Sequence, residues 1–205
     1  GVYYSAVQNK YNFGSDMNTN LCLQRAEGEF TLVLASDDAI YPKFIEKCVD
    51  MFIEYPTISM VMVHRDEVDE TGKITKTPPF YNQSCVIPRE EQAAVFMMSG
   101  IAIPGQRLCR ASAERRVKNW VCSFQVANDW YNNALYACVG DIGYISEPLM
   151  QYRVHTGNET SESERNLTAV MEHFQIINKI AKVTSEYGMT KPTKRLDEAT
   201  KKLGN

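Results

Sequence analysis

Among the 205 residues of the chain, no stretch reaches the ~18 consecutive apolar residues that a membrane-spanning helix needs. The longest candidate, residues 93–103, has about half that length and is interrupted by Ser99 and Gly100. Positive charge is not in excess either, because 22 Lys and Arg stand against 25 Asp and Glu, for a net charge of −3. A nucleic-acid-binding surface normally carries a basic patch, so we expect no nucleic-acid partner.

Cysteine pairs with metal-type spacing and a Gly-rich phosphate loop are also missing. No two of the six cysteines form a C-x-x-C motif, and several fall on apolar stripes of predicted helices, where Cys acts as a small hydrophobe. We therefore expect reduced thiols and a cytoplasmic location, either free or at the inner face of the membrane. The absence of a G-x-x-x-x-G-K-S/T loop weakens the case for a phosphohydrolase or a nucleotidyltransferase.

The most informative feature that is present is the pair Asp37-Asp38, which follows the apolar run 30–36. Two adjacent carboxylates repel each other unless a cation or donated hydrogen bonds offset the repulsion. Mg²⁺ and Mn²⁺ take oxygen ligands of this kind, so the pair indicates a metal site. A plain strand-to-helix turn, in which Asp37 or Asp38 caps the following helix, is the alternative explanation.

The residues on both sides of the pair favour the metal site. Upstream, residues 15–26 predict a helix that ends before Gly28, and residues 30–34 predict a strand buried on both faces. Downstream, Pro42 opens a predicted helix at 42–55, whose apolar residues recur at helical spacing. The two acids therefore lie on a loop between a strand and its helix, where open α/β sheets bind their ligands.

Further short motifs extend this pattern over roughly residues 9 to 160. They are Asn12-x-Gly14, Asn20, Ala26-x-Gly28-Glu29-Phe30, Leu34-Ala35-Ser36-Asp37-Asp38, Pro42, the stretch 64–73, Asn128-Asp129-Trp130, and the stretch 140–155. In this order and spacing the chain resembles the inverting family 2 glycosyltransferases. The resemblance implies an α/β fold of the GT-A-like, Rossmann-like kind, with a mixed, mostly parallel sheet flanked by helices.

The chain departs from the family pattern in two places. The family often carries an acid two positions before Asp37, where this chain has Ala35. The predicted first strand, residues 2–7, also resembles one well inside the fold. We therefore expect about three βα units of ~30 residues, including the nucleotide-base-binding part, to be missing. On this interpretation residues 1–160 are the C-terminal portion of a GT-A-like domain, and residues 161–205 are a C-terminal helix and a charged tail.

The resemblance also assigns metal and donor roles. Asp38 is the expected first ligand of Mn²⁺ or Mg²⁺, and Asp37 shares the ion or binds a ribose hydroxyl of the donor. His155 completes the coordination of the metal, and Arg153 contacts the donor diphosphate. Arg153 or His155 could equally contact the donor diphosphate, and an ordinary loop hydrogen bond is the alternative for His155.

Asp129 is the expected catalytic base. It opens a predicted helix beside Trp130, where an aromatic wall can raise the pKa of a carboxyl group and a sugar of the acceptor can stack. An ordinary helix N-cap is the alternative role for Asp129.

Hydrophobic periodicity predicts the remaining elements. Strands are expected at 58–64, 142–145 and 148–152, and helices at 89–98, 111–118, 128–139 and 162–186. The charged run 191–202 is expected to be loosely held.

Together, these observations predict a metal-dependent, inverting glycosyltransferase. It would move a sugar from a nucleotide-diphosphate sugar, with a UDP-sugar favoured, to a hydroxyl of a glycan or glycoconjugate acceptor in cell-surface polysaccharide synthesis. The first alternative is a non-catalytic fragment that binds glycans or partners, and the second is a metal-dependent phosphohydrolase or nucleotidyltransferase. An incomplete sheet would expose apolar surface, so we also expect a homo-oligomer.

Overall fold

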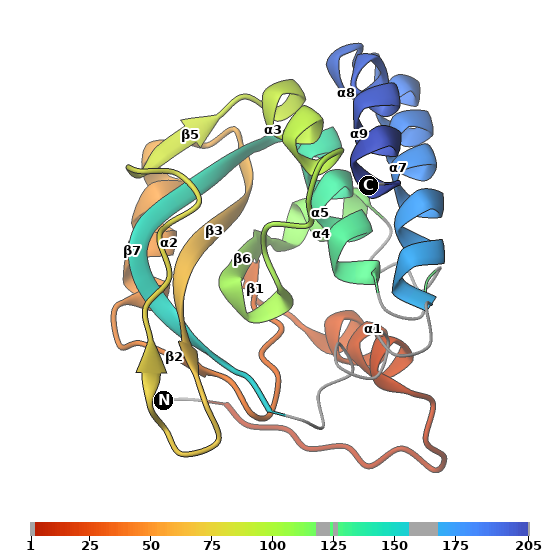
Figure 1. Ribbon diagram of the computed structural model, residues 1–205. Helices are drawn as coiled ribbons and strands as arrows, with labels where there is room; N and C mark the ends of the chain where they lie inside the picture. The colour runs from red at the N-terminus through yellow and green to blue at the C-terminus, as the bar shows by residue number, and fades with distance from the viewer. Residues whose placement is uncertain (1–2, 118–123, 125–126, 156–167, 205) are drawn as a thin grey trace.

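The computed structural model describes residues 3–117, 124, 127–155 and 168–204, and it has helices on both sides of one curved sheet (Figure 1). The strands are β1 (Phe30–Thr31), β2 (Ala39–Ile40), β3 (Ile58–Val68), β4 (Ile74–Thr75), β5 (Cys85–Ile87), β6 (Arg107–Arg110) and β7 (Asp141–Arg153). The helices are α1 (Ser15–Arg25), α2 (Phe44–Glu54), α3 (Arg89–Phe96), η1 (Pro104–Gln106, a 3-10 turn), α4 (Ala111–Arg116), α5 (Asn128–Val139), α7 (Thr168–Glu186), α8 (Lys191–Lys194) and α9 (Leu196–Leu203).

Two long strands, β3 and β7, form the centre of the sheet. They run parallel, from Ile58 opposite Asp141 to Val68 opposite Arg153. The strand order is β1-β6-β3-β7-β2, with β4 paired to β3 and β5 paired to β7. All the other described pairings are antiparallel. The sheet is mixed, as expected, but the expectation of a mostly parallel sheet is wrong, because the short strands join the central pair in the opposite direction.

Three strand predictions are also corrected. Residues 3–7 are exposed and pair with no described strand, and the strand expected at 30–34 shortens to β1. The two strands expected at 142–145 and 148–152 are one continuous strand, β7. Its register against β3 shifts where His64 lies opposite Pro148, because proline has no N–H to donate to the ladder.

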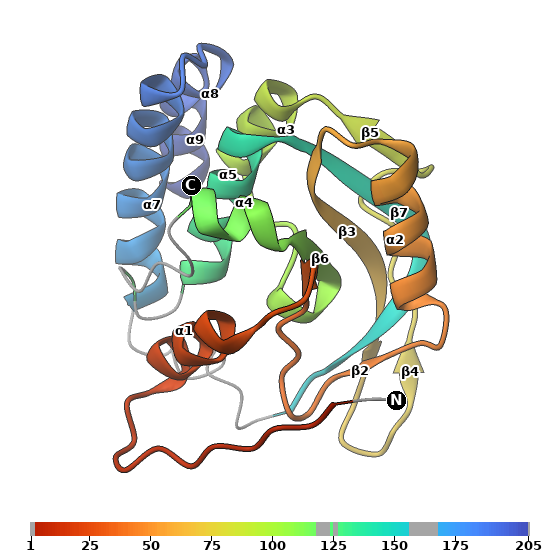
Figure 2. The same ribbon diagram turned by 180° about the vertical axis from the view of Figure 1, so that it is seen from behind.

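The helix predictions on either side of this sheet are confirmed to within a few residues. The helices expected at 15–26, 42–55, 89–98, 111–118 and 128–139 correspond to α1, α2, α3, α4 and α5. Helix α2 covers one face of β3 and β7 and buries Phe44, Cys48 and Phe52 (Figure 2). Helices α3 and α5 cover the other face.

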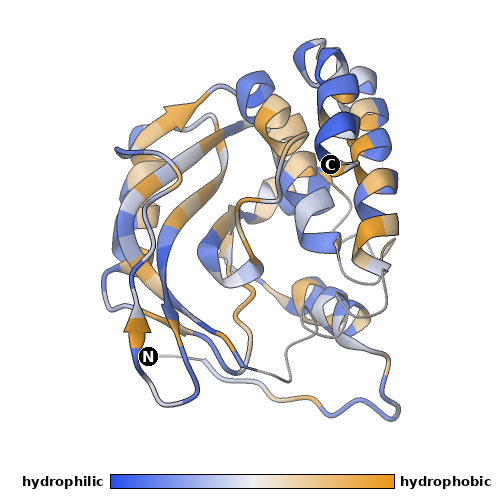
Figure 3. Ribbon diagram, in the orientation of Figure 1, coloured by the Kyte–Doolittle hydropathy of each residue, from blue (hydrophilic) through white to orange (hydrophobic). Residues whose placement is uncertain are grey.

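The C-terminal helices pack on this second layer. Ile176, Ile177 and Ile180 of α7 belong to the same buried cluster as the apolar residues of α5. The expectation of a loosely held tail is wrong, since Met189 is 3% exposed and Ala199 of α9 is 2% exposed. Figure 3 shows hydrophilic colour over much of α8 and α9, in agreement with their charged sequence. The start of the helix expected at 162–186 and the boundary expected at residue 160 lie outside the described residues.

No helix within the described ranges combines the length and the hydropathy that crossing a membrane requires. The described cysteines are free thiols, whereas Cys122 lies outside the described residues.

Candidate functional site

The acid pair lies where the chain enters the sheet edge beside the end of β7. Asp38 directly precedes β2, whose Ala39 pairs with Gln151 of β7. This pairing brings Arg153 to the acids, and its backbone N–H donates to Asp38 Oδ1 at 3.0 Å. The structure thus joins two candidate residues that are 115 positions apart in the sequence.

Arg153 and His155 make further contacts around the acid pair. Arg153 Nε donates to the carbonyl oxygen of Asp37 at 3.1 Å, and its Nη1 donates to the carbonyl oxygen of Asp69 at 3.1 Å. His155 Nε2 lies 3.2 Å from Asp37 Oδ2, an ion pair when the imidazole is protonated. Four candidates from the sequence, Asp37, Asp38, Arg153 and His155, therefore form one cluster.

The surroundings of Asp38 disfavour the charged form of its carboxyl group. Burial raises its pKa above the usual range, and the neighbouring Asp37 raises it further. The N–H of Arg153 and the cationic side chain of Arg65 act in the opposite direction without cancelling the shift. Asp38 Oδ2 accepts no hydrogen bond from a described residue, which leaves this oxygen available to a ligand.

The cluster does not by itself complete a metal site. Among the described residues, no three His, Cys, Asp or Glu side chains converge in a way that could hold a metal ion. Asp37 and Asp38 therefore offer a partial set of oxygen ligands, and the remaining ligands would have to come from elsewhere.

Arg65 was not singled out from the sequence as a site residue. It projects from β3, and its Nη1 donates to Gln106 Oε1 at 2.6 Å while its guanidinium lies 4.8 Å from the ring centroid of Tyr152. The stretch 64–73 contained this arginine, but nothing local indicated that it would face Asp38. That placement depends on the pairing of β3 with β7.

A buried polar network next to the cluster was also missed. Asp66 is 5% exposed and accepts a 2.8 Å hydrogen bond from Tyr41 Oη, which in turn accepts one from Gln151 at 3.0 Å. This network ties the residues after β2 to β3 and β7, and it fixes the frame on which Asp38 is mounted.

Asp129 occupies the first turn of α5, as expected. Its Oδ1 accepts the backbone N–H of Trp130 at 2.7 Å, and its own backbone N–H also donates to the carboxylate. Burial raises the pKa of Asp129, the nearby Arg107 lowers it, and Asp16 raises it. Asp16 comes from α1 and accepts a 2.5 Å hydrogen bond from Asn128 Nδ2, so the N-terminal ends of α1 and α5 meet here.

Arg107 holds the backbone of Asp129 through a hydrogen bond. It is 2% exposed, its Nη1 donates to the carbonyl oxygen of Asp129 at 3.2 Å, and it also contacts Asn133 Oδ1. A buried guanidinium that holds the first turn of a helix was not expected from the sequence.

Trp130 lies differently from the expectation. It is 7% exposed, its indole N–H donates to the carbonyl oxygen of Phe96, and its ring meets His173 edge-on at 5.1 Å. Little of the ring is available to a sugar in this conformation. Its role in acceptor binding stays a prediction.

One short segment connects the two acid sites. A Cβ added to Gly105 would lie 3.6 Å from Asp38 Oδ2, and two residues later Arg107 reaches Asp129. The η1 turn and the start of β6 therefore pass from the acid pair to the candidate base. The candidate base and a candidate metal-binding carboxylate thus both lie near residues 105–107.

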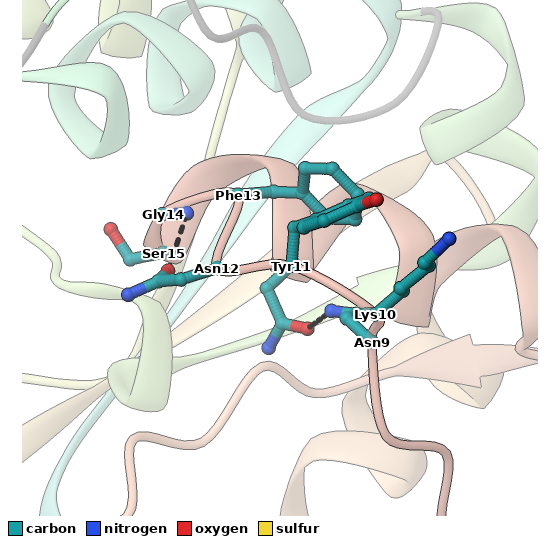
Figure 4. A pocket seen from close by; sticks show the side chains of 8 residues that line it. Asn9, Lys10, Tyr11, Asn12, Phe13, Gly14 and Ser15 are labelled. Atoms are coloured by element: carbon teal, nitrogen blue, oxygen red, sulfur yellow. Dashed lines mark hydrogen bonds between the residues drawn. The ribbon is translucent and has the colours of Figure 1, made fainter.

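A shallow hollow of about 460 Å³ lies in the segment that leads into α1 (Figure 4). Residues of that one segment line it, and it is shaped by hydrogen bonds from Asn9 to Asn18 and from the N–H of Gly14 to Asn12. None of the candidate acids lines it.

Comparisons with known proteins agree with the α/β fold. The family model described as Glycosyl transferase family 2 matches residues 5–117, more than half of the chain. No curated protein matches. Among solved structures, TarS 1-349 of S. aureus has a similar fold, with a TM-score of 0.59 and 13% identity over 83% of this chain and 44% of that chain. The same TarS fragment in complex with UDP-GlcNAc has a TM-score of 0.58 and 15% identity over 79% of this chain and 44% of that chain. The chain thus spans less than half the length of these TarS fragments.

Proposed function

The chain belongs to glycosyl transferase family 2, and from that premise we propose that its acids serve an inverting sugar transfer. The donor would be a nucleotide-diphosphate sugar and the acceptor a hydroxyl of a glycan or glycoconjugate. The observation that carries the proposal is the closeness of the two acid sites, since Gly105 lies near Asp38 and Arg107, two residues later, donates to the carbonyl oxygen of Asp129. A similar TarS fragment is known in complex with UDP-GlcNAc, which favours a UDP-sugar as the donor.

The proposed metal is Mn²⁺ or Mg²⁺, held by Asp38 Oδ2 with Asp37 and His155 in support. Carboxylate oxygens suit these cations, and the raised pKa of Asp38 indicates a carboxylate that a cation would stabilise. When bound, the ion would neutralise charge that develops on the departing diphosphate. Arg153 already spans Asp37 and Asp69, so its guanidinium is held where a second positive charge can face the same phosphates.

Asp129 would act as the base. Its Oδ1 accepts the N–H of Trp130, and Oδ2 would take the proton from the acceptor hydroxyl. The deprotonated oxygen then attacks the anomeric carbon on the face opposite the leaving diphosphate, and the configuration inverts. A raised pKa strengthens this carboxylate as a base, provided that it is ionised at the working pH.

The setting of this reaction is also a proposal. A role in cell-surface polysaccharide or glycoconjugate synthesis, at a cytoplasmic location or at the inner face of the membrane, fits a family 2 transferase with a sugar-nucleotide donor. Trp130 would contribute to acceptor binding through the part of its side chain that remains exposed.

A non-catalytic fragment that binds glycans or partners is the second candidate, favoured by the limited share of the TarS fragments that the chain covers. The two functions are separated by incubating the chain with radiolabelled UDP-GlcNAc and Mn²⁺, with EDTA as the control. A transferase releases or transfers the sugar only when the metal is present. A binding module retains glycan on an array and leaves the donor intact.

A further inference from the structure

A second polar pocket lies at the opposite end of the sheet from the acids. It is about 440 Å³ in volume and is lined by the first residues of β3 and β7, together with residues of α3 and α4. Strands β3 and β7 begin at this end, and β7 leads to Arg153 at the other end (Figure 1). With a rise of about 3.3 Å per residue, the 13 residues of β7 separate the two ends by roughly 40 Å along the strand.

Three arginines line this pocket, and backbone carbonyl groups orient each of them. Arg89 Nη1 donates to Cys138 at 3.1 Å, and Arg116 Nη1 donates to Val139 at 2.8 Å. Arg110 donates through Nε and Nη2 to the carbonyl oxygens of Ile58 and Phe52, both at 3.2 Å. Two consecutive carbonyl groups at the end of α5 thus each accept a hydrogen bond from a guanidinium group that lines the pocket.

These bonds do not use the full donor capacity of the arginines. A guanidinium carries five N–H donors, and Nε and Nη2 of Arg89 and Arg116 donate to no described residue. Anchoring one Nη1 to a carbonyl group leaves the opposite edge of each guanidinium for a second acceptor. Interaction with the end of α5 explains why the arginines lie there, but it does not explain this surplus of donors.

Asp141 and Glu29 supply negative charge at the pocket. Asp141 is a carboxylate that lines it, and its two oxygens accept hydrogen bonds from the backbone N–H of Arg89 at 2.9 Å and from Thr57 Oγ1 at 2.8 Å. Glu29 lies 3.5 Å from Arg110 and offsets part of that charge only. Three guanidinium charges against the two carboxylates of Asp141 and Glu29 therefore leave the pocket with a positive balance of one charge.

We propose that this arginine pocket binds a phosphoryl group, at a site separate from the acid cluster. Oriented guanidinium groups recognise phosphate oxygens in a bidentate manner, which a point charge such as lysine does not. The volume exceeds that of a single phosphate ion, so part of an organic group attached to the phosphate can enter as well. The same chemistry is presented by free inorganic phosphate and by the headgroup of phosphatidic acid.

The test uses the wild-type chain and two variants, with no donor or acceptor present. Inorganic phosphate is titrated at constant ionic strength, against a chloride control, while the Nε–H resonances of the arginines are followed by NMR. The resonances of Arg89 and Arg116 are expected to shift in a saturable way. That of Arg115, an exposed arginine on the same helix as Arg116 that does not line the pocket, is expected to stay in place.

The double variant Arg89→Gln/Arg116→Gln is expected to weaken binding about tenfold or more, whereas Arg115→Gln keeps wild-type binding. Vesicles of phosphatidic acid in phosphatidylcholine, compared with phosphatidylcholine alone, identify the source. Vesicle binding that depends on Arg89 and Arg116 assigns a lipid headgroup, and binding of inorganic phosphate alone assigns a free phosphate.

Equal shifts with chloride, equal loss in Arg115→Gln, or absence of binding in both arms would overturn the proposal. Sugar transfer enters none of these readouts, so failure here leaves the proposed transferase function untouched.

Discussion

At the scale of single residues, Asp38 is held in an environment that opposes its charge. Its pKa is raised by burial and by Asp37, so the folded state keeps a proton at pH values where the unfolded state has lost it. The stability of the metal-free protein should therefore fall as the pH rises above 3.8 and through the raised pKa of Asp38. Carboxyl groups with pKa values shifted in this way are typical of functional sites.

We predict that Asp38→Asn abolishes metal-dependent transfer while the protein is at least as stable as the wild type at pH 7. Asparagine removes the charge, and its oxygen can still accept the N–H of Arg153. Thermal unfolding of both proteins at pH 7 and pH 3.5 measures the effect, and the advantage of the variant should shrink at the lower pH. A variant that is less stable than the wild type at pH 7 would argue against a strained carboxylate.

Arg107 offers a second prediction at this scale. Because its positive charge lowers the pKa of Asp129, Arg107→Gln should raise that pKa. The acidic limb of the pH profile of kcat/KM would then move to higher pH, since Asp129 must be ionised to act as a base. Circular dichroism checks that the variant is folded, and Arg107→Lys, which keeps a charge, should move the limb less. An unmoved limb in a folded Arg107→Gln protein would separate Arg107 from the base.

At the scale of elements, the packing of α2 on the central strands depends on Gly143, which has no side chain. A Cβ at Gly143 of β7 would lie 2.5 Å from Met51 Sδ and 3.1 Å from Val61 Cγ2. We predict that Gly143→Ala destabilises the fold by about 1–3 kcal/mol, because α2 must shift or Met51 must leave its rotamer. Denaturant unfolding measures the loss.

A matched control for this prediction is Gly204→Ala. A Cβ there meets only the carbonyl oxygens of Thr200 and Lys201, at 3.7 and 3.8 Å. The change in free energy of unfolding should stay within about 0.5 kcal/mol, as for an ordinary surface substitution. Equal losses in the two variants would mean that the contact with α2 is not the cause.

The same elements show what the sequence could predict. Helix α5 was predicted at its observed bounds, because apolar spacing and Asp129 in its first turn are local signals. The strand expected at 30–34 was too long, since its observed length is set by pairing of Phe30 and Thr31 with Arg110 and Cys109, some 80 residues away. The direction of strand pairing was misjudged for the same reason, because it depends on how strands meet and not on their own residues.

Some residues of the candidate site could be identified from the sequence, and others could not. Asp37 and Asp38 were identifiable because they follow a predicted strand, and Asp129 because it stands in the Asn128-Asp129-Trp130 motif on which the family resemblance partly rests. Arg65 and Arg107 were missed, because their importance arises only when β3 and β6 bring them to acids that are distant in the sequence.

At the scale of the whole molecule, the segment that precedes α1 leaves large side chains in solvent. Tyr3 is 91% exposed and Tyr4 is 83% exposed, and the segment and the start of α1 expose further apolar side chains: Val7, Tyr11, Phe13 and Met17. Contiguous apolar exposure of this kind promotes association. We predict that the 205-residue chain forms a dimer or a larger species at micromolar concentration.

Sedimentation velocity tests this prediction. A variant with Tyr3→Ser, Tyr4→Ser and Phe13→Ser should shift the population toward monomer, because it removes large apolar side chains that are half or more exposed in the monomer. Three substitutions at polar exposed positions, Asn82→Ser, Gln83→Ser and Lys76→Ser, provide the control and should leave the assembly unchanged. A wild-type chain that remains monomeric across the concentration range would contradict the prediction.

The most direct test of the proposed reaction is turnover of UDP-GlcNAc by wild type and Asp129→Asn, with donor affinity and product configuration measured on the same samples. Asparagine keeps the size and the hydrogen bond to the N–H of Trp130 but cannot take a proton, so turnover should fall by ~10²–10⁴ while donor affinity stays nearly constant. The product of the wild type should have inverted configuration at the anomeric carbon. Retained configuration, or an Asp129→Asn protein with wild-type turnover, would contradict the account.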